Sequence, residues 1–228
     1  MWLPLVLASG CATPADTVAP DAAVVTDAPE ERSFATYTIL PGAHSAQLSD
    51  REPRNPIDGV VSVTGRDYEL ALNSSAIYEL TMPTDPADQF DWNKLPGLSD
   101  CGEIDLSKDG AMFGWRWRLD VSPPVLEVTA YANNAGTHLW LDAPLFTLDA
   151  DDLAADQPLR YTVARAADHY EFTVTGAIRG RIIDVAATHP RRCADQPTDP
   201  LAWAGAFYFG GTSTAPHVLT ARIRETSD

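Results

Sequence analysis

The stretch that indicates the fold is FGWRWRL at residues 113–119, in which large apolar residues alternate with glycine and arginine. Alternation with a period of two is typical of a β-strand that has one face in a hydrophobic core. Arg116 and Arg118 would then point away from that core. We expect the other face to be buried throughout, at Phe113, Trp115, Trp117 and Leu119.

The same alternation recurs at residues 78–82, 126–130, 159–163, 170–174 and 219–224. The third and fourth of these runs are joined by a short polar turn, which predicts a β-hairpin. No amphipathic helix of three turns is found, and residues 150–156 could form one turn. Many half-buried antiparallel strands predict an all-β fold, a two-sheet antiparallel β-sandwich of the jelly-roll (concanavalin-like) type.

The composition narrows the classes of function. The chain has 228 residues, 45% of them hydrophobic, and a formal net charge of −16. The hydrophobic content is sufficient for a core and excludes wholesale disorder. The acidity argues against a nucleic-acid partner, because phosphates require Lys and Arg, and against adsorption of the folded part to anionic membranes.

The N-terminus carries an address signal. Residues 1–10 are apolar and then small, and Ala8-Ser9-Gly10-Cys11 resembles the lipobox of bacterial lipoproteins, although no Lys or Arg precedes the apolar run. The resemblance implies a signal segment at 1–10, lipidation of Cys11, and a protein anchored in the bacterial cell envelope. Membrane contact would then occur only through the N-terminal lipid.

A tether is expected at residues 11–33, followed by a single β-sandwich domain at 34–228. The tether is rich in Ala, Pro, Thr and Asp and lacks aromatic residues before the domain. Such a segment cannot bury enough apolar surface to offset its ordering entropy.

With Cys11 assigned to lipid, Cys101 and Cys193 remain as an even pair. In an oxidising compartment we expect them to form a disulfide, the alternative being two free thiols.

Candidate binding residues cluster near the opening stretch. Asp91, Trp92, Asn93 and Lys94 combine an aromatic face with polar groups that suit hydroxyl-rich ligands, and Pro96-Gly97 would hold them on a loop. The alternative is that Asp91 and Asn93 cap turns and Lys94 forms an ion pair. The outward arginines could bind the carboxylates of an acidic polysaccharide, or balance nearby acids. The expected groove is lined by Arg116, Arg118, Tyr131 and this loop, with His217 nearby.

Catalytic residues are indicated only weakly, at Glu103 and Asp105. Residues 102–109 resemble the Glu-x-Asp-x-x-Glu strand of laminarinase- and lichenase-type glycoside hydrolases, in which two carboxylates act from one strand face. Here the last position is Asp109, followed by glycine, so the acid/base is missing. We interpret the match as coincidence. A lyase that uses Lys94 with a Tyr and a His is a further alternative.

Metal ligands are also indicated weakly. The five histidines lack ligand spacing, and Asp149, Asp151 and Asp152 lack the pattern of an EF-hand loop. A structural Ca²⁺ at these three residues is the one cofactor considered, and otherwise we expect none.

Several motifs together resemble an uncharacterised family of secreted bacterial β-proteins. They comprise DWNKLPGLSDC at 91–101, GWRW at 114–117 and YFGGTSTAPH at 208–217, together with Gly42, His44 and the pair Ala130-Tyr131. The resemblance implies a concanavalin-like jelly roll and export, and it implies no activity.

Taken together, these observations predict an exported, lipid-anchored jelly-roll domain. We expect it to bind a polysaccharide or another polar polymer without catalysing a reaction. The alternatives are an envelope protein with a structural or protein-docking role, and a polysaccharide hydrolase or lyase. The sequence assigns no oligomeric state.

Overall fold

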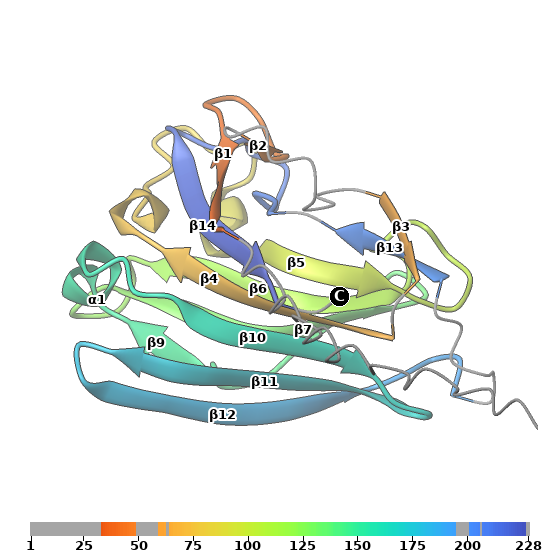
Figure 1. The fold of residues 1–228 in the computed structure, drawn as a ribbon. Coiled ribbons are helices and arrows are strands. Elements are labelled where there is room, and N and C mark those ends of the chain that lie inside the picture. Colours follow the sequence, from red (N-terminus) through yellow and green to blue (C-terminus); the bar gives the residue numbers. More distant parts are fainter. Residues whose placement is uncertain (1–32, 49–58, 63, 195–200, 206, 227–228) are drawn as a thin grey trace, which may run out of the picture. The chain divides into compact units, whose positions relative to one another are not determined.

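The computed structural model describes residues 33–48, 59–62, 64–194, 201–205 and 207–226. In this part of the chain the strands form two antiparallel sheets that share one hydrophobic core (Figure 1). The predicted all-β, two-sheet sandwich of jelly-roll type is confirmed. The predicted signal segment at 1–10, Cys11 and residues 12–32 of the tether lie outside the described residues.

The first sheet has the strand order β12–β11–β10–β4–β14–β1–β2. The predicted hairpin is confirmed as β10 and β11, which pair from Arg160–Thr175 to Arg165–Tyr170. The strands of this sheet are β1 (Ala35–Ile39), β2 (Gln47–Leu48), β4 (Gly65–Leu72), β10 (Leu159–Arg165), β11 (His169–Ile178), β12 (Arg181–Pro190) and β14 (Leu219–Glu225).

The second sheet has the order β3–β13–β5–β6–β7–β8, and β9 pairs with β7. Its strands are β3 (Gly59–Ser62), β5 (Asn93–Ser99), β6 (Gly110–Arg118), β7 (Val125–Asn134), β8 (Thr137–Trp140), β9 (Phe146–Leu148) and β13 (Leu201–Gly205). Short helices are the 3-10 helices η1 (Ser74–Ala76) and η2 (Pro86–Phe90) and the single-turn α1 (Ala150–Ala154). Within the described residues, no helix has the length and apolar character needed to cross a membrane.

The core follows the alternation read from the sequence. Phe113, Trp115 and Trp117 of β6 are buried, and the Phe113 ring meets Tyr161 of the facing sheet edge-on at 5.1 Å between centroids. Such aromatic contacts across the sandwich stabilise the stacking of the sheets. Leu119 was expected in the same row, but it follows the end of β6 and is 38% exposed.

Residues 78–82 do not form the predicted strand. This segment follows η1 and pairs with no strand in the part of the chain that the structure describes; the Leu80 N–H donates instead to the Gln89 side chain at 2.7 Å. Tyr78 is buried in the core, whereas Met82 is 92% exposed. The alternation is present, but a strand requires a neighbouring ladder, and the tertiary structure supplies a side chain in its place.

Pro96-Gly97 is likewise not a turn. Both residues lie inside β5, where the pairing with β6 shifts register between Lys94 and Gly97. The irregularity tolerates a residue without an N–H. A Cβ atom at Gly97 would overlap the Ala111 carbonyl oxygen, so glycine permits the close approach of the two strands. Asn93 and Lys94 are therefore strand residues and not loop residues.

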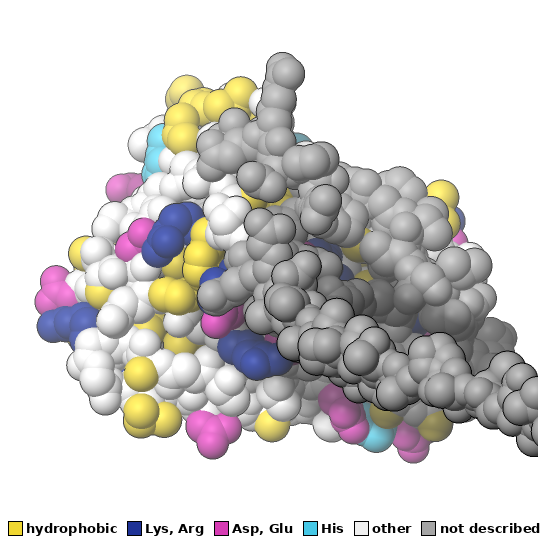
Figure 2. Space-filling model, viewed as in Figure 1, with side chains coloured by type: hydrophobic (Ala, Val, Ile, Leu, Met, Phe, Trp, Pro, Cys, Tyr) yellow, Lys and Arg dark blue, Asp and Glu magenta, His cyan; other side chains and the backbone are white. Residues whose placement is uncertain are grey.

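Acidic residues outnumber basic ones in the chain, and several surface arginines are paired with carboxylates. On the face drawn in Figure 2, basic side chains lie beside acidic ones and do not gather into a separate basic patch. Arg160 binds Asp67, Arg222 binds Asp156 and Arg224 binds Glu69 on the first sheet.

Candidate functional site

A groove of about 880 Å³ lies on the face of the second sheet that points away from the core. Its floor comes from β5, β6, β7 and β8, and its walls come from the loop after β5, from η2 and from residues 208 and 211. The lining residues that bear on function are Asp91, Trp92, Lys94, Asp105, Leu106, Met112, Arg116, Tyr131, Asn133, His138, Trp140 and Tyr208. A concave site with aromatic walls and a few polar groups is typical of ligand-binding sites.

Strand register brings the floor together. Met112 of β6 pairs with Tyr131 of β7, and Tyr131 pairs with Trp140 of β8. Because directly paired residues point to the same face, these three side chains form one row across the sheet. Trp92, Met112 and Tyr131, with Leu106 packed against them, make a small apolar cluster separate from the main core.

Tyr131 and Trp140 form a flat aromatic surface in the groove. Their rings are stacked with centroids 6.2 Å apart and planes 16° apart. Tyr131 is buried, and its burial raises the pKa of the phenol to about 12. Trp140 is 50% exposed, although it is a large aromatic residue on a short edge strand. An exposed indole of this kind can accept the apolar face of a ligand.

Lys94 lies beside this surface. Its Nζ donates to the Trp92 carbonyl at 2.5 Å and lies 4.9 Å from the centroid of the Tyr131 ring. Burial lowers the pKa of Lys94 to about 8, although the charge of Asp91 acts in the opposite direction. Among the described basic residues that line the groove, Lys94 has no ion-pair partner within contact distance, unlike Arg116. Perturbed groups of this kind concentrate at functional sites.

The two arginines are already neutralised. Arg116 binds Glu127 at 2.8 Å and stacks on the Trp92 ring at 4.0 Å. Arg118 binds both Glu127 and Asp120, and it is absent from the groove lining. Both arginines face away from the core, as expected, but their guanidinium groups already bind carboxylates of this chain. The interpretation that they balance nearby acids is the one that the contacts favour.

The remaining residues of the predicted binding loop have different roles. Asn93 is buried and structural: its amide donates to the Tyr78 hydroxyl at 3.1 Å and accepts from the Gly210 N–H at 2.7 Å. Trp92 is buried beneath Arg116 and contributes to the groove wall. Asp91 lines the groove and is exposed at its surface. Partial desolvation by the groove walls, followed by the nearby charge of Asp88, raises the pKa of its carboxyl.

The histidine in the groove is His138, not His217. His217 Nε2 donates to the Ser75 carbonyl at 2.9 Å, and His217 does not line the groove. His138 Nδ1 contacts the Asn133 side-chain oxygen at 2.6 Å. The sequence carried a signal for it: the tight Ala135-Gly136 turn, with both residues at positive φ, pairs Asn133 with His138 and Tyr131 with Trp140. Tyr208, by contrast, reaches the groove from a distant segment.

The loop at residues 101–109 forms one wall, and it is not the strand that the hydrolase resemblance would require. Glu103 contacts Lys108 at 3.7 Å and is absent from the lining, while Asp105 caps a turn through Ser107. The two carboxylates therefore do not share a strand face, in agreement with the interpretation of coincidence.

The predicted Cys101–Cys193 disulfide is confirmed and anchors this wall. Beside it, buried Asp100 accepts from Arg191 Nε at 2.5 Å and from the Tyr170 hydroxyl at 3.0 Å. Burial raises the pKa of Asp100, but hydrogen bonds from Arg191, from the Cys101 N–H and from Tyr170, together with the charge of Arg191, outweigh it and hold that pKa below its usual value. The groove wall is thus tied to β11 and to the segment after β12.

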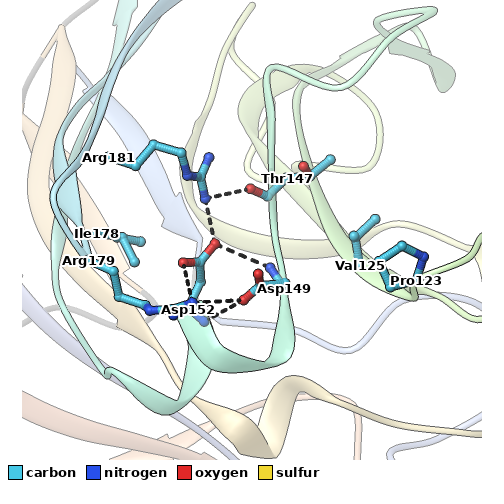
Figure 3. Close-up of a pocket in the computed structure, with 8 residues that line it drawn as sticks. All are labelled: Pro123, Val125, Thr147, Asp149, Asp152, Ile178, Arg179 and Arg181. Atoms are coloured by element: carbon cyan, nitrogen blue, oxygen red, sulfur yellow. Dashed lines mark hydrogen bonds and ion pairs between the residues drawn. The ribbon is translucent and has the colours of Figure 1, made fainter.

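Two of the weak calcium candidates, Asp149 and Asp152, line a second pocket away from the groove (Figure 3). Asp149 caps α1 by accepting from the Asp152 N–H at 2.7 Å. Asp152 binds Arg181 at 2.5 Å, and Arg179 lies 3.6–3.7 Å from all three carboxylates, including Asp151. Arg179 and Arg181 therefore balance two of these three negative charges.

Comparisons with known proteins give only distant structural likenesses. No protein-family model matches the chain, and no curated protein matches its sequence. An alginate lyase from Klebsiella pneumoniae aligns with 10% identity and a TM-score of 0.38, over 73% of this chain and 57% of that one, which is less than two thirds of its length.

Two further structures align at a similar distance. The CBM2 module of the evolved Dit protein of Lactobacillus casei BL23 phage J-1 aligns with 10% identity and a TM-score of 0.39, over 85% of this chain and 77% of that one. The kappa-carrageenase of Pseudoalteromonas carrageenovora, in complex with an oligotetrasaccharide, aligns with 9% identity and a TM-score of 0.26, over 84% and 78%. At these scores the likenesses carry no argument about what this chain binds.

Proposed function

We propose that the groove binds a polysaccharide. The observation that carries the proposal is the half-exposed Trp140, stacked on Tyr131 beside the Lys94 amine in an open groove. A sugar ring has apolar C–H faces that stack on aromatic rings, while its hydroxyls need donors and acceptors at the rim. Lys94, Asp91, Asn133 and His138 supply such groups.

The open shape of the groove supports a polymer as the ligand. The volume of about 880 Å³ is near the upper end for a site that holds a small molecule. Lining residues extend from β8 across the sheet to β5 and β13, so successive sugar units could contact different strands. The proposal does not depend on Arg116 or Arg118, whose charges are matched by Glu127 and Asp120.

Export and lipid anchoring through Cys11 belong to the same proposal. The disulfide supports a passage through an oxidising compartment, since disulfides are rare in cytosolic proteins. Metabolic labelling with a fatty acid tests the anchor: wild type should be labelled and Cys11→Ala should not. Equal labelling of both proteins would contradict it.

The binding proposal is tested with Trp140→Ala on immobilised neutral and acidic polysaccharides. Loss of a stacking contact of about 1.4 kcal/mol corresponds to a tenfold rise in Kd, so at least about tenfold weaker binding is expected. Ile182→Ala, an exposed apolar residue of β12, is the matched control and should bind as wild type does. If no polysaccharide binds, or if Trp140→Ala binds as tightly as wild type, the proposal is wrong, and a protein-docking role becomes the next hypothesis to test.

A further inference from the structure

Three ionisable side chains of the groove lie close together around the Tyr131 ring. Lys94 Nζ is 4.9 Å from the centroid of this ring, and the centroid of the His138 ring is 6.0 Å from it. The ammonium of Lys94 makes one hydrogen bond, to the Trp92 carbonyl, and has further N–H groups for a ligand. Among the described residues, the Tyr131 hydroxyl has no hydrogen-bond partner, and His138 is bonded only through Nδ1. All three line the same groove.

The contacts of His138 decide which nitrogen of its neutral ring carries the proton. The Asn133 amide nitrogen donates to the Leu106 carbonyl at 2.5 Å, and a carbonyl can only accept, so the orientation of the amide is determined. The Asn133 oxygen then faces His138 Nδ1 at 2.6 Å and requires a proton there. In the neutral ring, Nε2 then carries no proton, and its free lone pair can accept one as a general base does.

Tyr131 and Lys94 are both protonated at neutral pH, Tyr131 as a neutral acid and Lys94 as a cation. Burial raises the pKa of Tyr131 to about 12, so its hydroxyl keeps its proton at neutral pH and can donate it. Burial lowers the pKa of Lys94 to about 8, but the Asp91 charge favours the protonated form, so the amine is still a cation at neutral pH. A cation, a base and an acid thus lie around one site.

We propose that the groove cleaves a uronate-containing polysaccharide by β-elimination. This rests on the proposed polysaccharide binding and names both the substrate class and the reaction. The substrate class follows from Lys94, because a carboxylate on the sugar is the group that an unpaired ammonium would bind in this groove. A carboxylate at C5 is also what makes the adjacent C–H bond acidic enough to break.

The reaction balances with these three side chains alone. Lys94 holds the uronate carboxylate and stabilises the negative charge that develops on it. His138 Nε2 takes the proton from C5, and the electron pair of that C–H bond forms a C4=C5 double bond. The C4–O4 bond breaks, and Tyr131 donates its proton to O4. The products are a chain with an unsaturated uronate end and a chain with a free hydroxyl, and the proton returns from His138 to Tyr131 through solvent.

The test uses the folded wild-type protein with sodium alginate, polygalacturonate and hyaluronan as probes. Formation of the conjugated double bond is followed by ultraviolet absorbance, and binding of the same polymers is measured separately. At least one polymer should be cleaved. His138→Gln and Tyr131→Phe should lower the rate by about 100-fold or more while binding changes little, because acid–base groups contribute to the reaction step. His169→Gln, a half-buried histidine outside the groove, is the control and should retain full activity.

Exchange of the C5 hydrogen in heavy water separates the roles. Tyr131→Phe should still exchange this hydrogen, since His138 remains, whereas His138→Gln should not. Binding of uronate polymers without any double-bond product would overturn the β-elimination and leave the binding proposal intact. Binding of neutral polysaccharides only would also overturn it. If no polysaccharide of any kind binds, both proposals are wrong.

Discussion

The buried charge of Lys94 should lower the free energy of unfolding, and replacing Lys94 by methionine measures by how much. On folding, the pKa of the amine falls from 10.5 to about 8, mainly through burial. At about 1.4 kcal/mol per pKa unit, the protonated amine costs the folded state at most about 3 kcal/mol at pH 7. Lys94→Met keeps an unbranched side chain, one atom shorter and uncharged, and so removes that cost. It also leaves the Trp92 carbonyl without its donor, which costs about 1 kcal/mol.

The expected net effect is a gain of about 1–2 kcal/mol in the free energy of unfolding at pH 7, measured by urea denaturation. The sign of the pH dependence follows from linkage. Between pH 8 and 10.5 the unfolded chain binds more protons at Lys94 than the folded chain does, so wild-type stability rises with pH there relative to the variant. The advantage of the variant should therefore fall through zero between pH 8 and 10.5, and above pH 10.5 the variant should be about 1 kcal/mol less stable than wild type, because only the loss of the hydrogen bond to the Trp92 carbonyl remains.

Lys108→Met is the matched control, because the Lys108 side chain is 59% exposed, and it should change stability by less than about 0.5 kcal/mol. A loss of stability in Lys94→Met at pH 7, or a difference from wild type that is independent of pH, would refute the reasoning. A stabilised variant that also loses polysaccharide binding would show that Lys94 is kept for function at the expense of stability.

Three further predictions concern the support of the groove. Replacing Cys101 and Cys193 by alanine opens a link between residues 92 positions apart, for which the chain-entropy model gives a loss of about 4.6 kcal/mol; a loss below about 1 kcal/mol in urea denaturation would contradict it. Asp100→Asn leaves the buried guanidinium of Arg191 without its carboxylate and should cost about 3–5 kcal/mol by the same assay, and a neutral result would show that the pair is dispensable. Burial acts to raise the pKa of Asp88, but hydrogen bonds led by that from Ser213 lower it to about 2, so its contribution to stability is present above about pH 3.9 and is lost as the pH falls through about 2. Asp88→Asn should therefore flatten the acid limb of the stability profile, and an unchanged limb would exclude Asp88 as its source.

The strands could be read from the sequence wherever alternation coincided with a sheet partner. Residues 113–119 predicted both the strand and its buried tryptophans, because one face of a strand must be apolar to lie in a sandwich core. The same pattern at residues 78–82 predicted a strand that is absent, since nothing pairs with it. Periodicity therefore indicates which side chains are buried more reliably than it indicates a ladder.

The candidate site was predictable only in part. Lys94, Trp92, Arg116 and Tyr131 were anticipated and do line the groove. His138 and Trp140 follow from the pairing across the turn at residues 135–136, which places them opposite Asn133 and Tyr131. Tyr208 lies in a segment more than a hundred residues from Lys94, and only the fold brings their backbones into contact.

The sequence by itself determined the fold class and the outward direction of Arg116 and Arg118, and it predicted the pairing of two cysteines. These properties depend on local alternation and on simple counting, which do not require knowledge of distant neighbours. The tertiary structure alone decided which charges remain available in the groove. Arg116 and Arg118 meet Glu127 through the pairing of β6 with β7, whereas Lys94 meets a carbonyl and an aromatic ring. A charge is neutralised or left open by its partner in space, and strand pairing sets that partner.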